Sequence, residues 1–309
     1  MALSHRSAGR AALALVLGAV SGFAQFGGRP GDAVVYLVTS KGDQTFDAVA
    51  SNYQVPASAR ANFQKMFAPA VVPEAPFPDI PALKIAFLHV EPDDVFQVIL
   101  QDDTAVFPHH LYLTTFKIFT VSGTRRDYGN TDEQPREFTT GGFTTFLKQA
   151  DLGPNESQGG LLTVLGWTNT ALRPPFIETP RNQLGPAVPA GKTGTELVVD
   201  FAVFPVFEPW QAVGKQFAGN WLDGIDLKFL ERDPVAGSTA RQLRMRPGRT
   251  TPQFRMRGNT HFYVLQGNIT MTPFGGGTPL TFGPNDYAFI PDGYAFSLNN
   301  DRQSLIPGP

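Results

Sequence analysis

Few side chains in this sequence could bind a metal ion or transfer a proton. The 309 residues include five histidines and no cysteine. The absence of cysteine excludes thiolate zinc sites, iron–sulfur clusters, disulfides and thiol nucleophiles. Metal chemistry would therefore need histidine and carboxylate ligands, which suit manganese, iron, nickel or zinc.

Four candidate ligands lie in the N-terminal half of the chain. His89 and Glu91 are two residues apart, so on a strand they would point to the same face. His109 and His110 are neighbours and would face opposite ways on a strand, whereas Pro108 favours a loop, in which both could reach one ion. This set is one hypothesis for a metal site. The alternative is that these are ordinary structural or solvated side chains.

The composition narrows the class of protein. Charged residues make up 17% of the chain and the formal net charge is −2, so nothing electrostatic favours nucleic acid or an anionic membrane as partner. The 26 phenylalanines, 31 glycines and 27 prolines are typical of an all-β chain with many turns.

The first 24 residues have the pattern of a signal peptide. Arg6 and Arg10 precede a short apolar run, and small residues lead to a cleavage point after Ala24. The run is short for a membrane span, although an uncleaved anchor is the alternative. We therefore expect a secreted or periplasmic protein with no membrane association after cleavage.

Residues 25–204 predict a β-rich N-terminal domain with one short helical insert. The insert spans 45–68 and is interrupted at Pro56, and the polar segment 122–137 is expected to be a long loop. The expected strands are 33–39, 83–90, 95–100, 111–121, 138–147, 161–165 and 197–204.

Residues 205–224 are expected to connect this domain to a second one at 225–309. The second domain has short apolar runs separated by Gly, Pro and Asn, which predicts a small antiparallel barrel or jelly roll. Its first half contains Gly248, five residues, Phe254-x-Met256, three residues, Thr260, six residues and Gly267.

A second spaced pattern follows. It contains Asn285, five residues, Pro291-x-Gly293, two residues, Phe296, three residues and Asn300. Together the two patterns resemble the motifs of the cupin family, over about the last third of the chain. The resemblance implies a jelly-roll barrel with an inward-facing site.

In the cupin family, two histidines, a glutamate and a further histidine in these motifs bind a divalent metal. Here the equivalent positions hold Phe254, Met256, Thr260 and Phe296. A phenyl ring has no lone pair, and a thioether is a weak ligand for these metals. We therefore expect no metal cofactor at these positions. The predicted pocket is apolar with one hydroxyl, and either its own side chains fill it or it binds a small apolar or aromatic molecule.

The register of this motif decides which side chains face the barrel. The family frame puts Phe254 and Met256 inside and Arg255, Arg257 and His261 outside. A slip of one residue would reverse this and bury arginines without partners, which is costly. We interpret His261 as an outer-face histidine, with a role as ligand as the alternative. The six arginines between 241 and 257 are interpreted as a solvated face, with an anion-binding patch as the alternative.

Two structural questions remain open at this point. The N-terminal domain could be a degenerate first cupin, because His89-x-Glu91 and Asp94 precede an apolar strand, or an unrelated β domain. Few residues follow Asn300, so the barrel would have an uncovered sheet edge. Either the N-terminal strand 33–39 or a second subunit, in a homo-oligomer, would cover it.

Three functions are compatible with these observations. The first is an exported, metal-free cupin-like protein that binds a small apolar or aromatic ligand or has a structural role. The second is an exported metal-dependent dioxygenase of the flavonol-cleaving cupin type, with its metal in the N-terminal half. The third is a carbohydrate-binding module that uses exposed aromatic rings and arginines. The sequence favours the first.

Overall fold

The computed structural model describes most of the chain after the expected signal peptide. The described residues are 26–40, 46–68, 82–128, 136–148, 150–168, 176–178, 210–212, 223–233 and 237–301. The predicted signal peptide at 1–24, the predicted strand at 197–204 and most of the predicted connection at 205–224 lie outside these ranges. Within them, no helix is both long enough and apolar enough to cross a membrane.

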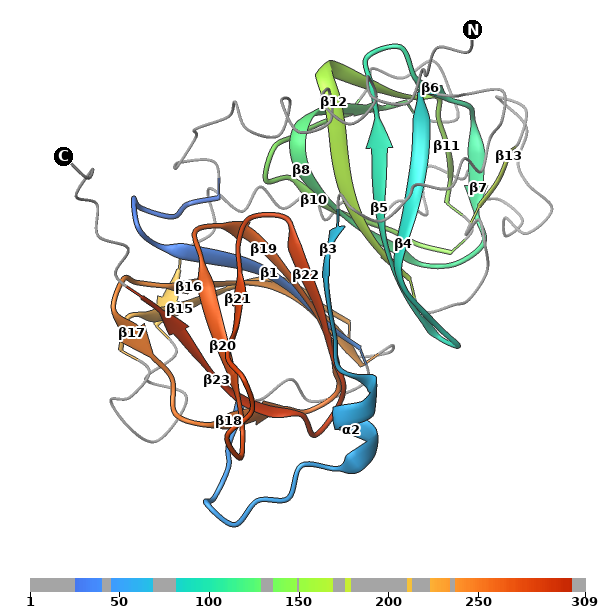
Figure 1. The fold of residues 1–309 in the computed structure, drawn as a ribbon. Helices are drawn as coiled ribbons and strands as arrows, with labels where there is room; N and C mark the ends of the chain where they lie inside the picture. Colours follow the sequence, from blue (N-terminus) through green and yellow to red (C-terminus); the bar gives the residue numbers. More distant parts are fainter. Residues whose placement is uncertain are drawn as a thin grey trace, which may run out of the picture.

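The described chain forms two β-barrels that pack side by side (Figure 1). The N-terminal barrel is made of a seven-stranded sheet and a three-stranded sheet. The larger sheet contains β4 (Leu83–Glu91), β5 (Asp94–Gln101), β6 (Val106–Phe107), β8 (Phe116–Asp127), β9 (Arg136–Thr139), β10 (Phe143–Phe146) and β12 (Asn155–Thr168). The smaller sheet contains β7 (His110–Tyr112), β11 (Asp151–Leu152) and β13 (Phe176–Glu178).

The C-terminal barrel is made of a seven-stranded and a six-stranded sheet. The first contains, in spatial order, β14 (Gln211–Ala212), β15 (Ile225–Asp233), β16 (Ser238–Met245), β1 (Ala33–Ser40), β19 (Asn259–Gln266), β22 (Asp286–Ile290) and β3 (Gln64–Phe67). The second contains β2 (Phe46–Ala48), β17 (Arg249–Thr250), β18 (Phe254–Met256), β20 (Ile269–Pro273), β21 (Leu280–Phe282) and β23 (Ala295–Asn300).

The first strand of the chain is an inner strand of the C-terminal barrel. β1 lies between β16 and β19, where Val35 pairs with Leu243 on one side and Val264 on the other. β2 then pairs with β18, and β3 pairs with β22. This confirms that an N-terminal strand supplies pairing to the barrel. It also differs from the expected boundary, because β1, β2 and β3 belong to the C-terminal barrel and not to a domain spanning 25–204.

The helical insert is shorter than predicted. Residues 46–48 form an edge strand, and the helix α2 covers only Ala57–Asn62. The apolar spacing around Phe46 resembles a helix, but pairing with β18 directs its ring into the barrel, with its centroid 5.2 Å from that of Phe254. Tertiary pairing therefore decides this segment, and not its local periodicity.

The prediction of a loop over the polar segment 122–137 was wrong for its first part. β8 continues to Asp127 and its polar half pairs with both β12 and β9. The predicted single strand at 111–121 is in fact two, β7 and β8. The polar half of β8 is held by backbone hydrogen bonds to its neighbouring strands. It therefore does not need the alternating apolar residues by which a strand is recognised in a sequence.

Three apolar clusters stabilise this arrangement. One fills the C-terminal barrel and one fills the N-terminal barrel. The third lies between the two seven-stranded sheets and includes Tyr36, Phe96, Trp167, Tyr263 and Tyr287. Side chains alternate along each strand, so the same strands supply a barrel interior on one face and the inter-barrel contact on the other.

We predict that a chain lacking residues 25–40 cannot form the C-terminal barrel. The deletion removes eight buried residues of β1 and separates β16 from β19. A chain that starts at Gln25 is the control and should fold, as judged by amide dispersion in NMR spectra and by a cooperative unfolding transition. A folded, soluble and monomeric deletion variant would show that β1 is dispensable.

Candidate functional site

The cupin-motif positions in the C-terminal barrel lie inside the barrel. Phe254, Met256, Thr260 and Phe296 are each at most 2% exposed, as the family frame requires. The rings of Phe254 and Phe296 have centroids 4.7 Å apart. The hydroxyl of Thr260 lies 3.2 Å from that of Thr39 on β1. Two aromatic rings, a thioether and a hydroxyl that is already hydrogen-bonded do not fit a divalent metal ion.

The turn residues of the two motifs have the backbone shape that the pattern requires. Asn285 stands where the family has glycine and has a φ of 72°, a left-handed conformation that asparagine tolerates. Gly267 has a φ of 70°, and a Cβ there would come within 2.5 Å of the carbonyl oxygen of Asp32. The turn chemistry of the fold is therefore retained although the ligand residues are not.

One of the six arginines was wrongly assigned to a solvated face. Arg241 is 1% exposed and lies beside Leu37, on the barrel-facing side of β16. Its guanidinium lies 4.8 Å from the ring centroid of Phe46, and Nη2 lies 3.5 Å from the hydroxyl of Thr39. Burial lowers the pKa of Arg241 to about 9, with a further contribution from Arg232.

Arg255 and Arg257 lie at the surface and contact a carboxylate, whereas Arg244, with a 12% exposed side chain, is also largely buried. The side chains of Arg255 and Arg257 are 35% and 51% exposed, and both approach Asp47. Arg244 donates through Nε and Nη2 to Asp226. These guanidiniums are therefore spread over separate ion pairs.

His261 is on the outer face of the barrel, as predicted, but it is fully buried against the other barrel. Its Nε2 donates to Asp94 Oδ1 at 2.7 Å. Its Nδ1 lies 2.9 Å from the hydroxyl of Tyr287, whose pKa burial raises well above the ordinary value. Both ring nitrogens of His261 are therefore hydrogen-bonded, and the imidazole links Asp94 to Tyr287.

Asp94 is the centre of this inter-barrel network. Besides His261, it accepts hydrogen bonds from Trp167 Nε1 and Ser40 Oγ, both at 2.8 Å. Burial would raise the pKa of Asp94, but His261, Trp167 and Ser40 together hold it well below its usual value. The network joins β5 and β12 of one barrel to β1 and β19 of the other.

The hypothetical metal ligands of the N-terminal half are not brought together. His89 stacks on Phe289 at 3.7 Å between the barrels, with Nε2 3.7 Å from Glu91 and 4.0 Å from Asp94. His110 instead packs between Phe107 and Tyr112, in the N-terminal barrel. Its Nδ1 donates to the carbonyl oxygen of Pro108 at 2.7 Å, and burial lowers its pKa to about 3. Among the described residues, no three His, Asp or Glu side chains converge on a metal position.

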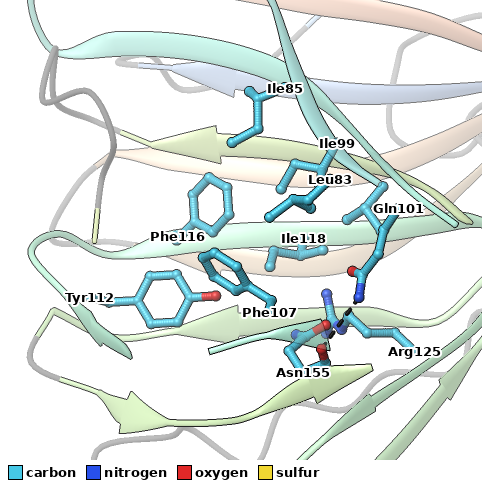
Figure 2. Close-up of a pocket in the computed structure, with 11 residues that line it drawn as sticks. Leu83, Ile85, Ile99, Gln101, Phe107, Tyr112, Phe116, Ile118, Arg125 and Asn155 are labelled. Carbon is cyan, nitrogen blue, oxygen red and sulfur yellow. Dashed lines mark hydrogen bonds between the residues drawn. The ribbon is translucent and has the colours of Figure 1, made fainter. Parts of the chain in front are cut away.

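The N-terminal barrel contains a cavity of about 30 Å³ (Figure 2). This exceeds the roughly 10–15 Å³ that one water molecule needs. Its aliphatic wall is formed by Leu83, Ile85, Ile99, Ile118 and Val164. Its aromatic wall is formed by Phe107, Tyr112 and Phe116. Apart from one end, the lining is apolar.

The polar end of the cavity is formed by Gln101, Arg125 and Asn155. Gln101 Nε2 donates to the carbonyl oxygens of Ala105 and Asn155, at 3.0 and 3.3 Å. The side-chain amide of Asn155 donates to Asp127 Oδ1. An arginine beside these groups repels cations, so this lining does not fit a divalent metal.

Arg125 is the charged group of the cavity. It is 2% exposed, and Nη2 lies 3.1 Å from Asp127 Oδ2 and 3.3 Å from the hydroxyl of Thr144. Its guanidinium lies 4.7 Å from the ring centroid of Phe138. Within the described chain, its Nε and Nη1 are buried and have no hydrogen-bond acceptor. These donors are the least satisfied polar atoms of the cavity.

Sequence reasoning missed this cavity and named none of its polar residues. Arg125 and Asp127 lie in the polar half of β8, which reads as a loop, and Asn155 opens β12 with no apolar pattern around it. The one signal in the sequence is indirect. Arg125 and Asp127 are two residues apart, so on a strand their side chains lie on the same face. This pairing could have been predicted only if the segment had been recognised as a strand.

Comparison with solved structures identifies the architecture. A provisionally named dioxygenase of Nostoc punctiforme PCC 73102 matches 89% of this chain and 88% of its own, with a TM-score of 0.59 and 13% identity. Oxalate decarboxylase of Bacillus subtilis matches over 76% and 72%, with a TM-score of 0.52 and 11% identity. A cupin 2 conserved barrel domain protein of Leptotrichia buccalis also matches, at a TM-score of 0.44 and 8% identity.

The first two likenesses establish the fold and not the activity. The chain is an all-β protein with the cupin jelly-roll fold, which confirms the resemblance found in its C-terminal motifs. No protein-family model matches it, and no curated protein matches its sequence.

We predict that His89 makes stability depend on pH between about 4 and 6.5. Burial, and then the neighbouring His261, lower the pKa of His89 from 6.5 to about 4. In this window the unfolded chain binds the extra proton, so the free energy of unfolding falls as the pH falls, by up to about 3 kcal/mol. In His89→Gln this part of the slope should disappear, as measured by urea unfolding at pH 4, 5, 6.5 and 7.5.

The control variant is Arg126→Gln, at a position with a 29% exposed side chain that pairs with Glu137. It should keep the wild-type slope. Equal slopes for wild type and His89→Gln would contradict the assignment.

Proposed function

We propose that this protein is an exported cupin-fold binding protein that takes a small, largely apolar molecule without using a metal ion. The observation that supports it best is the cavity in the N-terminal barrel, with two apolar walls and a small polar end. Ligand sites have this character, because apolar contact supplies affinity and a few polar groups orient the ligand.

The N-terminal barrel is a better candidate than the motif region from which we first expected a pocket. Phe46, Phe254 and Phe296 pack against one another inside the C-terminal barrel, with centroid separations of 5.2 and 4.7 Å. Their rings occupy the space that the family leaves for metal and substrate. The C-terminal barrel then acts as a packed support that also supplies one wall of the inter-barrel contact.

Export completes the proposal. It is supported by the arginines and the apolar run of residues 1–24. A secreted or periplasmic binding protein needs a stable fold more than a catalytic centre. The buried Asp94 network and the shared β1 strand serve that need.

We expect the mature protein, from Gln25 onward, to carry much less than one metal ion per chain. The reason is that neither the C-terminal motif positions nor the cavity lining offers a fitting ligand set. Elemental mass spectrometry on protein purified without chelators or a histidine tag measures this. Near-stoichiometric manganese, iron, nickel, copper or zinc would contradict the proposal and restore the dioxygenase hypothesis.

We also expect the hydrocarbon 2-methyl-1-butene to bind in the N-terminal barrel, with an outward shift of the lining side chains, because the cavity of about 30 Å³ is smaller than this probe. Methyl NMR shifts of Ile85, Ile118 and Val164 should change with saturation as the probe is added. Filling the cavity with Ile118→Phe should abolish these changes, because the larger ring occupies the same space. Val106→Phe, at a 49% exposed position, is the matched control and should bind as the wild type does. Shifts confined to other regions would place the site elsewhere.

A further inference from the structure

We infer that the ligand of the N-terminal barrel carries an uncharged oxygen acceptor, such as a ketone or ester carbonyl, that accepts a hydrogen bond from Arg125. This inference rests on the proposed binding function and specifies its chemical class. The cavity defines a small apolar body, and Arg125 defines the polar group.

Two N–H groups of Arg125 lack a hydrogen-bond acceptor in the described part of the chain. The guanidinium is 2% exposed, and its Nε and Nη1 have no acceptor among the described residues. A buried donor left without a partner is costly, and more so when it is charged. The guanidinium is one of the groups that line the cavity, so an acceptor placed inside it removes this cost.

The side chains at the polar end disfavour a ligand whose polar group is a hydrogen-bond donor. Arginine has five N–H donors and no acceptor. The neighbouring Asn155 amide nitrogen is already used by Asp127, and the Gln101 amide nitrogen by two carbonyl oxygens. Burial raises the pKa of Tyr112, so its phenol stays protonated at the cavity wall. Among the described residues, the unsatisfied donors at the polar end are therefore those of Arg125, and a ligand group that can only donate, such as an ammonium, would leave them unsatisfied.

The buried Arg125–Asp127 ion pair disfavours a charged ligand group. Asp127 lies 3.1 Å from Arg125 and is 4% exposed, so the guanidinium already has its counter-charge inside the barrel. Burial raises the pKa of Asp127, although Arg125 and Asn155 act in the opposite direction. A carboxylate ligand would bring a second negative charge beside this carboxyl group, which buried surroundings penalise. A neutral carbonyl oxygen accepts the hydrogen bond without that penalty.

The test compares 2-butanone with 2-methyl-1-butene, its hydrocarbon isostere, on the whole mature protein. Titrations followed by NMR should show the ketone binding about tenfold more tightly or better, because only the ketone satisfies Arg125. The Arg125 Nε–H signal should shift on adding the ketone and not on adding the alkene. This readout needs no variant, so it stands even where a substitution prevents folding.

Variants then assign the preference to the guanidinium. Arg125→Met with Asp127→Leu removes the buried ion pair as a unit, a change that proteins often tolerate. We expect the ketone preference to disappear while the alkene still binds. Arg126→Met is the matched control, because Arg126 is on the same strand and pairs with Glu137 at the surface. It should keep the wild-type preference.

Each result separates the two proposals. Equal binding of ketone and alkene, with an unmoved Arg125 signal, overturns this inference and leaves the apolar binding site standing. Tighter binding of 2-methylpropanoate than of 2-butanone overturns the assignment of a neutral acceptor. Binding of none of the three probes overturns the proposed function itself.

Discussion

The structure depends on the burial of β1 on both of its faces. Val35 and Leu37 enter the interior of the C-terminal barrel, whereas Tyr36 and Val38 enter the contact between the barrels. One strand thus ties the beginning of the chain to its end and the first barrel to the second. Such a strand has no solvent face, which is why its sequence is a continuous apolar run without alternation. The same constraint explains why the two barrels form a single apolar body and not two loosely linked units.

Asp94 and His261 are tolerated in the inter-barrel contact because they are hydrogen-bonded to each other and to their neighbours. Asp94 accepts three hydrogen bonds, and both ring nitrogens of His261 are hydrogen-bonded. A half-satisfied network at this depth would cost more than an apolar contact, so its completeness is what makes it compatible with stability. Because the donors come from β1, β12 and β19 and the carboxylate from β5, the network also favours one relative position of the barrels. Orienting the barrels in this way is a structural role for His261 and Asp94.

The two barrels use their interiors differently. In the C-terminal barrel, rings, a methionine and an engaged threonine fill the place where the cupin family binds metal, and Arg241 lies among them beside Phe46 and Thr39. In the N-terminal barrel, smaller aliphatic side chains leave a cavity, and Arg125 with Asp127 forms its polar end. The same jelly-roll frame therefore encloses packed side chains in one barrel and a small, largely apolar cavity in the other.

The sequence alone was enough to predict the all-β class, the C-terminal jelly roll, the register of Phe254 and Met256 and the non-ligating motif positions. These follow from local rules, namely turn residues at fixed spacing and strand alternation against an apolar core. Three features needed the tertiary structure. The strand β1 joins the C-terminal barrel by pairing with β19, more than 200 residues away in the sequence. His261 is buried by the sheet of the other barrel, which no local sequence pattern indicates. The cavity and its Arg125 depend on the polar half of β8, which is held by backbone hydrogen bonds to β12 and β9. Backbone pairing of this kind requires no periodic pattern of side chains, so the sequence does not indicate it.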